Sequence, residues 1–345
     1  MTRAQAIRAA LAFAAAFLAA CDPTPTRLND EFLAMGTTVS IAIGGDAPKD
    51  AQQALDAAKD ELKRIGREWY AWGLDGELVQ VNKAIAAGNT STVSPELAEL
   101  LTRSATYFKS SEGAFDPAVG GLVRLWGFDA AQRSMKPAPT IKQLDGWQRD
   151  HPTFADVTVE GLRVSSRRRD LVLDLGAVGK GFAVDLAVAM LQARGIRHAL
   201  VNAGGNLRAI SDGAAKPWRI AIRDSRAVRA LAWLELRGDE SVSTSGDYER
   251  FALVNGKRIH HLLDPRTGRD AEQTIAVTVV AADATLADAA STAIFVAGKE
   301  RWRAVAQTLG VDQVLRIDAN GSVEVTAKLG ERLQFKSSEA PQTSR

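Results

Sequence analysis

Residues 174–185, DLGAVGKGFAVD, constrain the fold more than any other segment of this chain. The apolar residues before Gly176 favour a strand, and the residues from Gly181 to Arg194 favour a helix. Glycines between them let the backbone approach a ligand closely, and the N–H groups at a helix start suit phosphate. The spacing G-x-x-G-x-G differs from the dinucleotide-binding fingerprint and from the Walker A pattern. The segment therefore predicts either a tight strand–helix connection or a phosphate site outside those two folds.

The rest of the chain mixes helices and strands without strict strand–helix–strand alternation, and no internal repeat is visible. This order favours an α+β or mixed α/β fold over a doubly wound parallel sheet. We expect strands at 33–43, 171–175 and 275–281, antiparallel strands within 217–255, and helices at 50–67, 286–296 and 300–309, with another helix starting at Ser94-Pro95.

The composition indicates a globular protein with a substantial core. The 345 residues are 46% hydrophobic and 24% charged, which argues against disorder and against a protein with many membrane spans. The formal charge of +2 lacks the strong basic excess that nucleic-acid binding needs, so no nucleic-acid partner is expected. One cysteine and four histidines exclude an intrachain disulfide and a cysteine-based metal centre.

The first twenty residues have the pattern of a secretory signal peptide. Arg3 and Arg8 are the only charges, and residues 9–20 form an uninterrupted apolar run. A membrane-spanning helix needs about 20 apolar residues, so this run is too short to span comfortably. A positive start, a short apolar stretch and small residues before a cleavage point are typical of a leader. We therefore expect residues 1–20 to be removed.

The only cysteine, Cys21, directly follows this leader. The sequence Leu18-Ala-Ala-Cys21 resembles the lipobox of bacterial lipoproteins, in which the cysteine carries lipid. Asp22 resembles the signal that retains such proteins in the inner membrane, facing the periplasm. Residues 21–30 are then expected to form a tether. The alternative is an ordinary leader followed by a free or buried cysteine.

Two further segments are candidates for chemistry. Asp288 and Thr292 lie at positions i and i+4 of an expected helix, so their oxygen atoms can share a cation such as Mg²⁺. The alternative is that Thr292 bonds to its own helix and Asp288 is solvated. Residues 202–206, NAGGN, predict a glycine turn whose amides either bind an anion or form a plain turn.

Seven segments, taken in order, resemble the ApbE family of flavin transferases. The resemblance covers about residues 31–330, and it implies a two-lobed fold with an FAD site between the lobes. Residues 331–345 are polar and are expected to be disordered. The matching segments read MGTTVSI, GAFDPAVGGLVRLWGF, DLGAVGKGFAVD, NAGGN, SGDYER, HLLDPRTG and ADATLADAASTAIFV.

The resemblance also implies the site residues. The implied FAD contacts are Met35, Trp72, Ala114, Phe115, Asp116, Asp174, Lys180 and Leu263. The implied Mg²⁺ ligands are the Ala177 carbonyl, Asp288 and Thr292. Lys180 and Mg²⁺ would neutralise charge in the reaction, and either His261 or Asp288 would act as general base. One departure is that the family's S-E-L-S-x-x-N stretch reads GELVQVN at residues 76–82, without its two serines.

The implied function is Mg²⁺-dependent transfer of FMN from FAD to a Thr or Ser hydroxyl of an exported redox protein, with release of AMP. The implied acceptors are subunits of sodium-pumping NADH:quinone oxidoreductase, of Rnf complexes or of similar flavinylated systems. Two alternatives stay open. The chain can be an FAD pyrophosphatase that releases free FMN, or a lipid-anchored flavin-binding protein without enzymatic activity.

Overall fold

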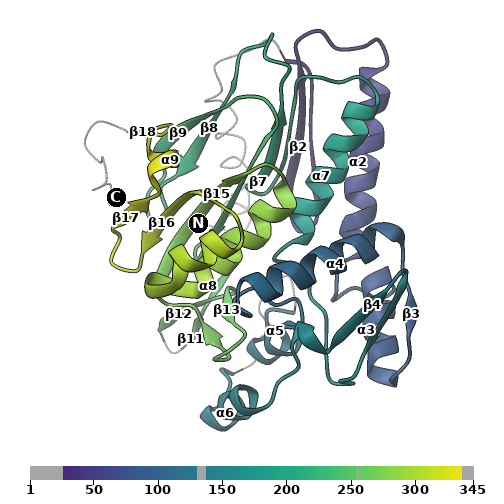
Figure 1. Ribbon diagram of the computed structural model, residues 1–345, viewed down its shortest axis with the longest axis vertical. Coiled ribbons are helices and arrows are strands. Elements are labelled where there is room, and N and C mark those ends of the chain that lie inside the picture. Colours follow the sequence, from purple (N-terminus) through teal and green to yellow (C-terminus); the bar gives the residue numbers. More distant parts are fainter. Residues whose placement is uncertain (1–25, 130–136, 255, 336–345) are drawn as a thin grey trace, which may run out of the picture.

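The computed structural model describes residues 26–129, 137–254 and 256–335, and Figure 1 shows their arrangement. Its main feature is an eight-stranded sheet in which every neighbouring pair of strands is antiparallel. An antiparallel sheet covered by helices is an α+β arrangement, so the predicted fold class is confirmed. In spatial order the strands are β1 (Thr26–Ala34), β2 (Thr37–Gly44), β6 (Ala199–Ala203), β7 (Asn206–Ile210), β10 (Glu240–Gly246), β15 (Thr274–Ala281), β16 (Gln313–Asp318) and β17 (Val323–Val325).

Three long helices pack against this sheet: α2 (Ala51–Glu68), α7 (Gly179–Ala193) and α8 (Ala284–Thr308) (Figure 1). The prediction of a helix at 50–67 is confirmed, because the apolar side chains of α2 recur at helical spacing and are buried. The two helices predicted at 286–296 and 300–309 are halves of α8, which is kinked at Gly298, where φ is 69°.

A second sheet packs on the large one. It contains β18 (Gln334–Phe335), β9 (Ala230–Leu236) and β8 (Trp218–Arg223), in that order. Alternate residues of β8 are buried, as expected for a strand with one face on the core. The antiparallel strands predicted within 217–255 are therefore confirmed, although β10 leaves this group and joins the large sheet.

The remaining elements form a smaller, mainly helical lobe and two hairpins near the junction of the lobes (Figure 1). The lobes share one continuous hydrophobic core, which contains Val39 of β2 and Leu100 of the small lobe. The Ser94 hydroxyl accepts the Leu97 N–H, so the predicted start of a helix at Ser94-Pro95 is confirmed. The small lobe holds α3 (Glu77–Ala87), β3 (Ser91–Thr92), α4 (Pro95–Ser110), α5 (Gly120–Trp126), α6 (Ile141–Arg149), η2 (Phe154–Asp156), β4 (Val157–Glu160) and β5 (Arg163–Ser166). The hairpins pair β11 (Phe251–Val254) with β12 (Lys257–His260) and β13 (Leu263–Asp264) with β14 (Arg269–Asp270), and α9 (Ala327–Gly330) precedes β18.

The prediction of a single strand at residues 33–43 is wrong. The chain reverses at Met35 and Gly36, where φ is 52° and 72°, so that β1 and β2 form a hairpin. A tight hairpin turn needs left-handed backbone at both central positions, and methionine gives no sequence signal for it. Because β1 pairs with β2 from Thr26 onward, residues 26–30 are strand rather than tether.

The prediction of a strand at residues 171–175 is also wrong. This segment makes one isolated bridge, between Val172 and Val119, and does not join a sheet. Its backbone groups bond to other partners, because Asn82 accepts the Leu173 N–H at 2.8 Å and donates to the Leu173 carbonyl at 3.0 Å. The Asp174 N–H donates to the Pro117 carbonyl at 2.8 Å. The segment is therefore an ordered connection between the lobes.

Two findings concern the ends of the described chain. The predicted disordered tail is wrong for residues 331–335, because Leu333 is buried and Gln334–Phe335 pairs with β9. Cys21, the leader and residues 336–345 lie outside the described residues. Within the part that is described, no helix is both long enough and apolar enough to span a membrane.

Candidate active site

The first contact between predicted site residues joins Trp72 to Asp174. The indole Nε1–H of Trp72 donates to Asp174 Oδ2 at 2.9 Å, and the Gly176 N–H donates to Oδ1 at 2.8 Å. The Arg124 guanidinium of α5 lies 5.3 Å from the centre of the Trp72 ring. These contacts fix the indole ring of the small lobe beside the glycine-rich turn that leads into α7.

Asp288 joins this glycine-rich turn to α8. The Gly181 N–H donates to Asp288 Oδ2 at 2.9 Å, and within the described residues this carboxylate accepts no other hydrogen bond. Asp288 is 3% exposed, so the alternative of a solvated carboxylate is wrong. Burial raises the pKa of Asp288, while the Lys180 ammonium and the Gly181 N–H act in the opposite direction.

Gly181 is required for this close approach of α7 and α8. A Cβ atom at this position would lie 2.1 Å from the Ala284 carbonyl oxygen and 2.8 Å from Asp288 Cβ. Asp185, one turn further along α7, accepts the N–H groups of Ala284 and Thr285 at 2.9 Å each. The start of α7 and the start of α8 are thus held together by two carboxylates, one from each helix.

Thr292 lies one helical turn after Asp288, among buried hydroxyl groups. Its Oγ1 atom is 3.3 Å from Ser245 Oγ of β10, so the alternative in which Thr292 bonds to its own helix is also wrong. Ser291 Oγ lies 2.8 Å from Ser245 Oγ and 3.2 Å from Ser243 Oγ. The facing residues of β10 and α8 therefore present oxygen atoms on the same side as Asp288.

The glycines of the NAGGN segment form a plain β-turn between β6 and β7. The Gly205 N–H donates to Asn202 Oδ1 at 3.0 Å, and the Gly204 N–H donates to the Thr38 carbonyl at 3.2 Å. Both amides are already used, so they are not an anion-binding nest. The Gly181 N–H, engaged by Asp288, is likewise not available to a phosphate.

His261 follows directly after β12. Its N–H donates to the Arg250 carbonyl at 3.1 Å, and its Nδ1 atom lies at the same distance from that oxygen. Because a carbonyl can only accept, Nδ1 carries the proton and Nε2 is the basic nitrogen. Burial, assisted by the charges of Arg250 and Lys180, lowers the pKa of His261 to about 3. The ring is therefore neutral at physiological pH.

The predicted Mg²⁺ ligands, the Ala177 carbonyl, Asp288 and Thr292, suit the chemistry of that ion. Mg²⁺ prefers hard oxygen donors and keeps several waters, so few protein ligands suffice. A buried carboxylate with a single hydrogen bond is a donor that a cation would satisfy. Across the described ranges, no group of three or more His, Cys, Asp or Glu side chains could hold a metal. The donor types, one carboxylate, one hydroxyl and one carbonyl, suit this ion, and the ligand set stays a prediction of the ApbE resemblance.

Comparison with known proteins identifies the family. Residues 35–315 match the model of the ApbE family. This chain is an ApbE family member. It is 38% identical over 341 residues to an FAD:protein FMN transferase of Rhodobacter capsulatus, covering 96% of this chain but 64% of that protein. The corresponding Haemophilus influenzae transferase is 30% identical, with 92% of this chain and 94% of the relative covered.

Solved structures of ApbE proteins have the same fold. The Thermotoga maritima ApbE protein matches with a TM-score of 0.81 at 30% identity, covering 88% of this chain and 98% of that one. The apo form of the Pseudomonas stutzeri flavinyl transferase ApbE matches with a TM-score of 0.75 at 28% identity, covering 88% and 96%. The predicted ApbE-like architecture is therefore confirmed.

Three of the residues that the ApbE resemblance marked as flavin contacts face the core. Ala114 and Phe115 are each 1% exposed, so neither residue presents surface to a ligand in this structure. Asp116 Oδ1 accepts the N–H groups of Ala118 at 2.7 Å and Phe154 at 3.1 Å. Burial raises the pKa of Asp116 to about 7, although these N–H groups oppose the shift.

Two other predicted flavin contacts, Met35 and Leu263, lie in packed positions. Met35, in the β1–β2 turn, packs against α2, where a Cβ on Gly66 would come within 3.0 Å of the Met35 amide. Leu263 is 5% exposed and packs with Leu122 and Trp126 of α5. In the described structure neither residue is hydrogen-bonded to Lys180 or Asp288, so their roles stay predictions of the ApbE resemblance.

Glu249 belongs to the site, but sequence reasoning assigned it no role. Its side chain is open to solvent, yet the surrounding protein raises the pKa of Glu249; Lys180 opposes this shift and Asp288 reinforces it. The Lys180 charge therefore influences the pKa of Glu249, of His261 and of Asp288. The SGDYER segment was recognised as an ApbE motif, and a search for acids inside that motif would have found Glu249.

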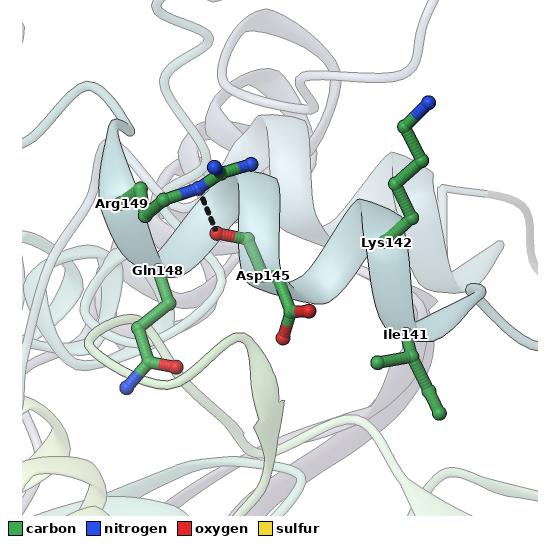
Figure 2. Close-up of a pocket in the computed structure, with 5 residues that line it drawn as sticks. All are labelled: Ile141, Lys142, Asp145, Gln148 and Arg149. Atoms are coloured by element: carbon green, nitrogen blue, oxygen red, sulfur yellow. Dashed lines mark hydrogen bonds between the residues drawn. The ribbon is translucent and has the colours of Figure 1, made fainter.

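Two pockets of the described chain differ in whether they contain a predicted site residue. A pocket of about 370 Å³ contains Asp116 together with Phe108, His151 and Arg266. Figure 2 shows a second pocket, of about 550 Å³, whose side chains spread along one helix and do not converge on a point. It is lined only by Ile141, Lys142, Asp145, Gln148 and Arg149 of α6. None of these five is a predicted site residue.

Proposed function

We propose that this chain is an FAD:protein FMN transferase that depends on Mg²⁺. The observation that carries the proposal is the Gly181–Asp288 contact, which gathers Lys180, Asp288 and Thr292 at the junction of α7 and α8. The Haemophilus influenzae relative carries this enzyme name, and the similarity covers 94% of its length. A site that combines one lysine, one buried carboxylate and several hydroxyl groups suits a pyrophosphate substrate with a divalent cation.

The reaction is a displacement at phosphorus. The oxygen of a Thr or Ser hydroxyl in the acceptor protein attacks the phosphorus of the FMN part of FAD. A new phosphoester bond forms, the bond from that phosphorus to the bridging oxygen breaks, and AMP leaves with that oxygen. The hydroxyl proton passes to a general base, and no electrons are transferred. Catalysis of such a step rests mainly on positioning and charge neutralisation.

Lys180 neutralises charge on the pyrophosphate as AMP leaves. Its Nζ atom donates to the Gly176 carbonyl at 3.0 Å, which holds the ammonium over the glycine-rich turn. Ala177, Asp288 and Thr292 would hold Mg²⁺, which when bound supplies further positive charge to the departing phosphate oxygens. Trp72 and Asp174, fixed by their mutual hydrogen bond, form the adjoining flavin contact.

His261 is the better placed of the two candidate bases. Its Nε2 atom is the unprotonated nitrogen, and a pKa near 3 keeps the ring neutral before substrate binds. A bound pyrophosphate would raise the pKa of this imidazole, because a nearby negative charge favours the protonated form. Asp288 remains the alternative base, although its carboxylate is the proposed metal ligand.

The acceptor and the anchor are proposed from the sequence. The acceptor is an exported or membrane redox protein, such as a subunit of sodium-pumping NADH:quinone oxidoreductase or of an Rnf complex. Cys21 carries lipid, which holds the enzyme on the periplasmic side of the inner membrane. Water in place of the acceptor hydroxyl would give FAD pyrophosphatase activity, and a flavin-binding role without catalysis would need no metal.

The product assay separates these functions. We would incubate the full-length protein with FAD, Mg²⁺ and the acceptor subunit, and measure flavin fluorescence in a denaturing gel alongside free FMN. A transferase gives fluorescent acceptor, a pyrophosphatase gives only free FMN, and a binding protein gives neither. Asp288→Asn keeps an oxygen for the Gly181 N–H, so the contact between α7 and α8 should survive. The variant removes the negative charge proposed to hold Mg²⁺, so it should abolish transfer while weakening FAD binding less. Intact flavinylation in this variant would exclude the metal assignment.

A further inference from the structure

The interface between β10 and α8 contains a network of polar side chains that ends at Thr292. Ser243 and Ser245 lie on the same face of β10, and their Oγ atoms are 3.2 and 2.8 Å from Ser291 Oγ of α8. Ser243 also donates to Asn206 Oδ1 of β7, and Ser245 Oγ lies 3.3 Å from Thr292 Oγ1. The polar network therefore runs from β7 through β10 to α8.

The polar network is buried except at its Thr292 end. Its other four members are buried, whereas Thr292 is partly exposed. A buried hydroxyl group needs a hydrogen-bond partner to offset its loss of water, and an apolar side chain of similar size has no such need. A fully bonded polar network instead fixes the orientation of its members. This favours a role for the network in orienting the group at its exposed end.

Counting protons gives the direction of the buried hydrogen bonds. Each hydroxyl group has one proton to donate and two lone pairs that accept. Ser243 uses its proton on Asn206. Ser291 donates either to the Asp288 carbonyl oxygen, 3.0 Å away, or to Ser243. If Ser291 donated to Ser245 instead, both of its other contacts would join two oxygen atoms without a proton between them. Ser245 therefore donates to Ser291.

The same count fixes the hydroxyl group of Thr292. Because Ser245 has used its own proton, it can only accept at the contact with Thr292, so Thr292 is the donor. Both lone pairs of the Thr292 oxygen are then left free. A cation binds a hydroxyl group through a lone pair, and the O–H donates to an acceptor behind it. Thr292 is thus held as a cation ligand one helical turn after Asp288.

We propose that Ser245 is a positioning residue for cation binding, which accepts the Thr292 proton and so turns the lone pairs of the Thr292 oxygen toward Mg²⁺. Asn206, Ser243 and Ser291 set the direction of that hydrogen bond from behind. The inference rests on the proposed Mg²⁺-dependent transferase function, and it gives a role to residues that the ApbE resemblance left without one.

The test measures the Kd of Mg²⁺ for the full-length protein by isothermal titration calorimetry, first with Mg²⁺ alone and then with FAD bound. No acceptor is present, so the measurement does not depend on transfer. The variants are Ser245→Ala, Thr292→Val, the double variant of these two, and Thr244→Val as the matched control. Thr244 lies on the opposite face of β10, where its hydroxyl group is 2.9 Å from that of Thr278 on β15. The control therefore breaks a similar pair of hydroxyl groups outside the polar network. Thermal melting without Mg²⁺ establishes that each variant is folded.

We expect Ser245→Ala to raise the Kd of Mg²⁺ about tenfold, which is the usual effect of removing a residue that orients a metal ligand. Thr244→Val should lower the melting temperature by a similar amount but keep the wild-type Kd. Thr292→Val should weaken Mg²⁺ binding at least as much as Ser245→Ala does. The double variant should bind Mg²⁺ no more weakly than Thr292→Val, because Ser245 acts through Thr292.

Two kinds of failure can be told apart. A wild-type Kd in Ser245→Ala, or losses that add up in the double variant, would overturn the positioning role of Ser245. An unchanged Kd in Thr292→Val, or no Mg²⁺ binding by the wild type with FAD bound, would instead contradict the Mg²⁺ site of the proposed function.

Discussion

At the residue scale, Asp116 links pH to stability. The folded-state pKa of about 7 lies above the value of about 4 expected in the unfolded chain, so the folded state binds the extra proton between these values. The stability contributed by this proton is complete below pH 4 and is lost as the pH rises through 7. Between pH 5 and pH 8 the loss from this group is about 3 kcal/mol.

Asp116→Asn tests this linkage because the amide oxygen can still accept from Ala118 and Phe154. We expect urea unfolding of the variant to lose about 3 kcal/mol less than the wild type does between pH 5 and pH 8. The two proteins are compared at each pH, so titration of other groups cancels. Parallel pH profiles for the two proteins would show that Asp116 is ionised in the folded state throughout.

His261 is the second residue whose role can be isolated. If its Nε2 atom accepts the hydroxyl proton, His261→Ala should lower kcat for flavin transfer by about 10² to 10⁴, the usual contribution of a positioned base. FAD affinity should change little, since the ring is bound to Arg250 and not to a proposed flavin contact. Stopped assays from pH 5 to 9 measure this. A wild-type rate at every pH would exclude His261 and leave Asp288 as the base.

At the element scale, the crossing of α7 and α8 depends on one glycine. Gly181→Ala places a methyl group 2.1 Å from the Ala284 carbonyl oxygen, so the helices must separate and the bond to Asp288 must lengthen. We expect a loss of about 1–3 kcal/mol in unfolding free energy and a large loss of transfer activity. Gly179→Ala is the matched control, because its added Cβ would lie 3.6 Å from the nearest atom, Leu175 Cβ. Equal stability of the two variants would contradict the crossing argument.

Elements specified by local signals could be predicted from the sequence, and those set by distant contacts could not. α2 carries its apolar spacing within its own residues, and α4 starts at its own cap residue Ser94, so the predicted bounds of α2 and the predicted start of α4 were close. The apolar run at 171–175 also fits a strand pattern, and hydrogen bonds to the Asn82 side chain and to the Pro117 carbonyl, both far away in sequence, make it a connection. The hydrogen bond between Trp72 and Asp174 could not be predicted from the residues around either one, because the two are far apart in sequence. Family motifs named Asp174, Lys180 and Asp288, and the SGDYER motif contains Glu249, but only the folded structure shows that Lys180 and Asp288 influence the pKa of Glu249.

At the scale of the whole molecule, the last described residues join the two sheets. Arg332 donates to both Glu240 oxygens, at 2.8 and 2.9 Å, and to the Glu235 carbonyl at 3.0 Å. Glu240 belongs to β10 of the large sheet and Glu235 to β9 of the small one. A polar C-terminal sequence suggests disorder when it is considered alone. Here its order comes from carboxylates and backbone groups that lie about a hundred residues earlier.

This arrangement predicts opposite outcomes for two truncations. A chain that ends after Phe335 keeps Arg332, the buried Leu333 and the pairing of β18 with β9, so its melting temperature should match that of the full chain. A chain that ends after Gly330 loses all three, which should cost about 3–5 kcal/mol from the lost leucine burial and charge-assisted hydrogen bonds. The two sheets contact each other on the face of the large sheet opposite α7 and α8. The α7–α8 junction is therefore not part of the contact that the truncation removes, and FAD binding at low temperature should survive both truncations. Equal melting temperatures for the two truncated chains would show that residues 331–335 do not hold the sheets together.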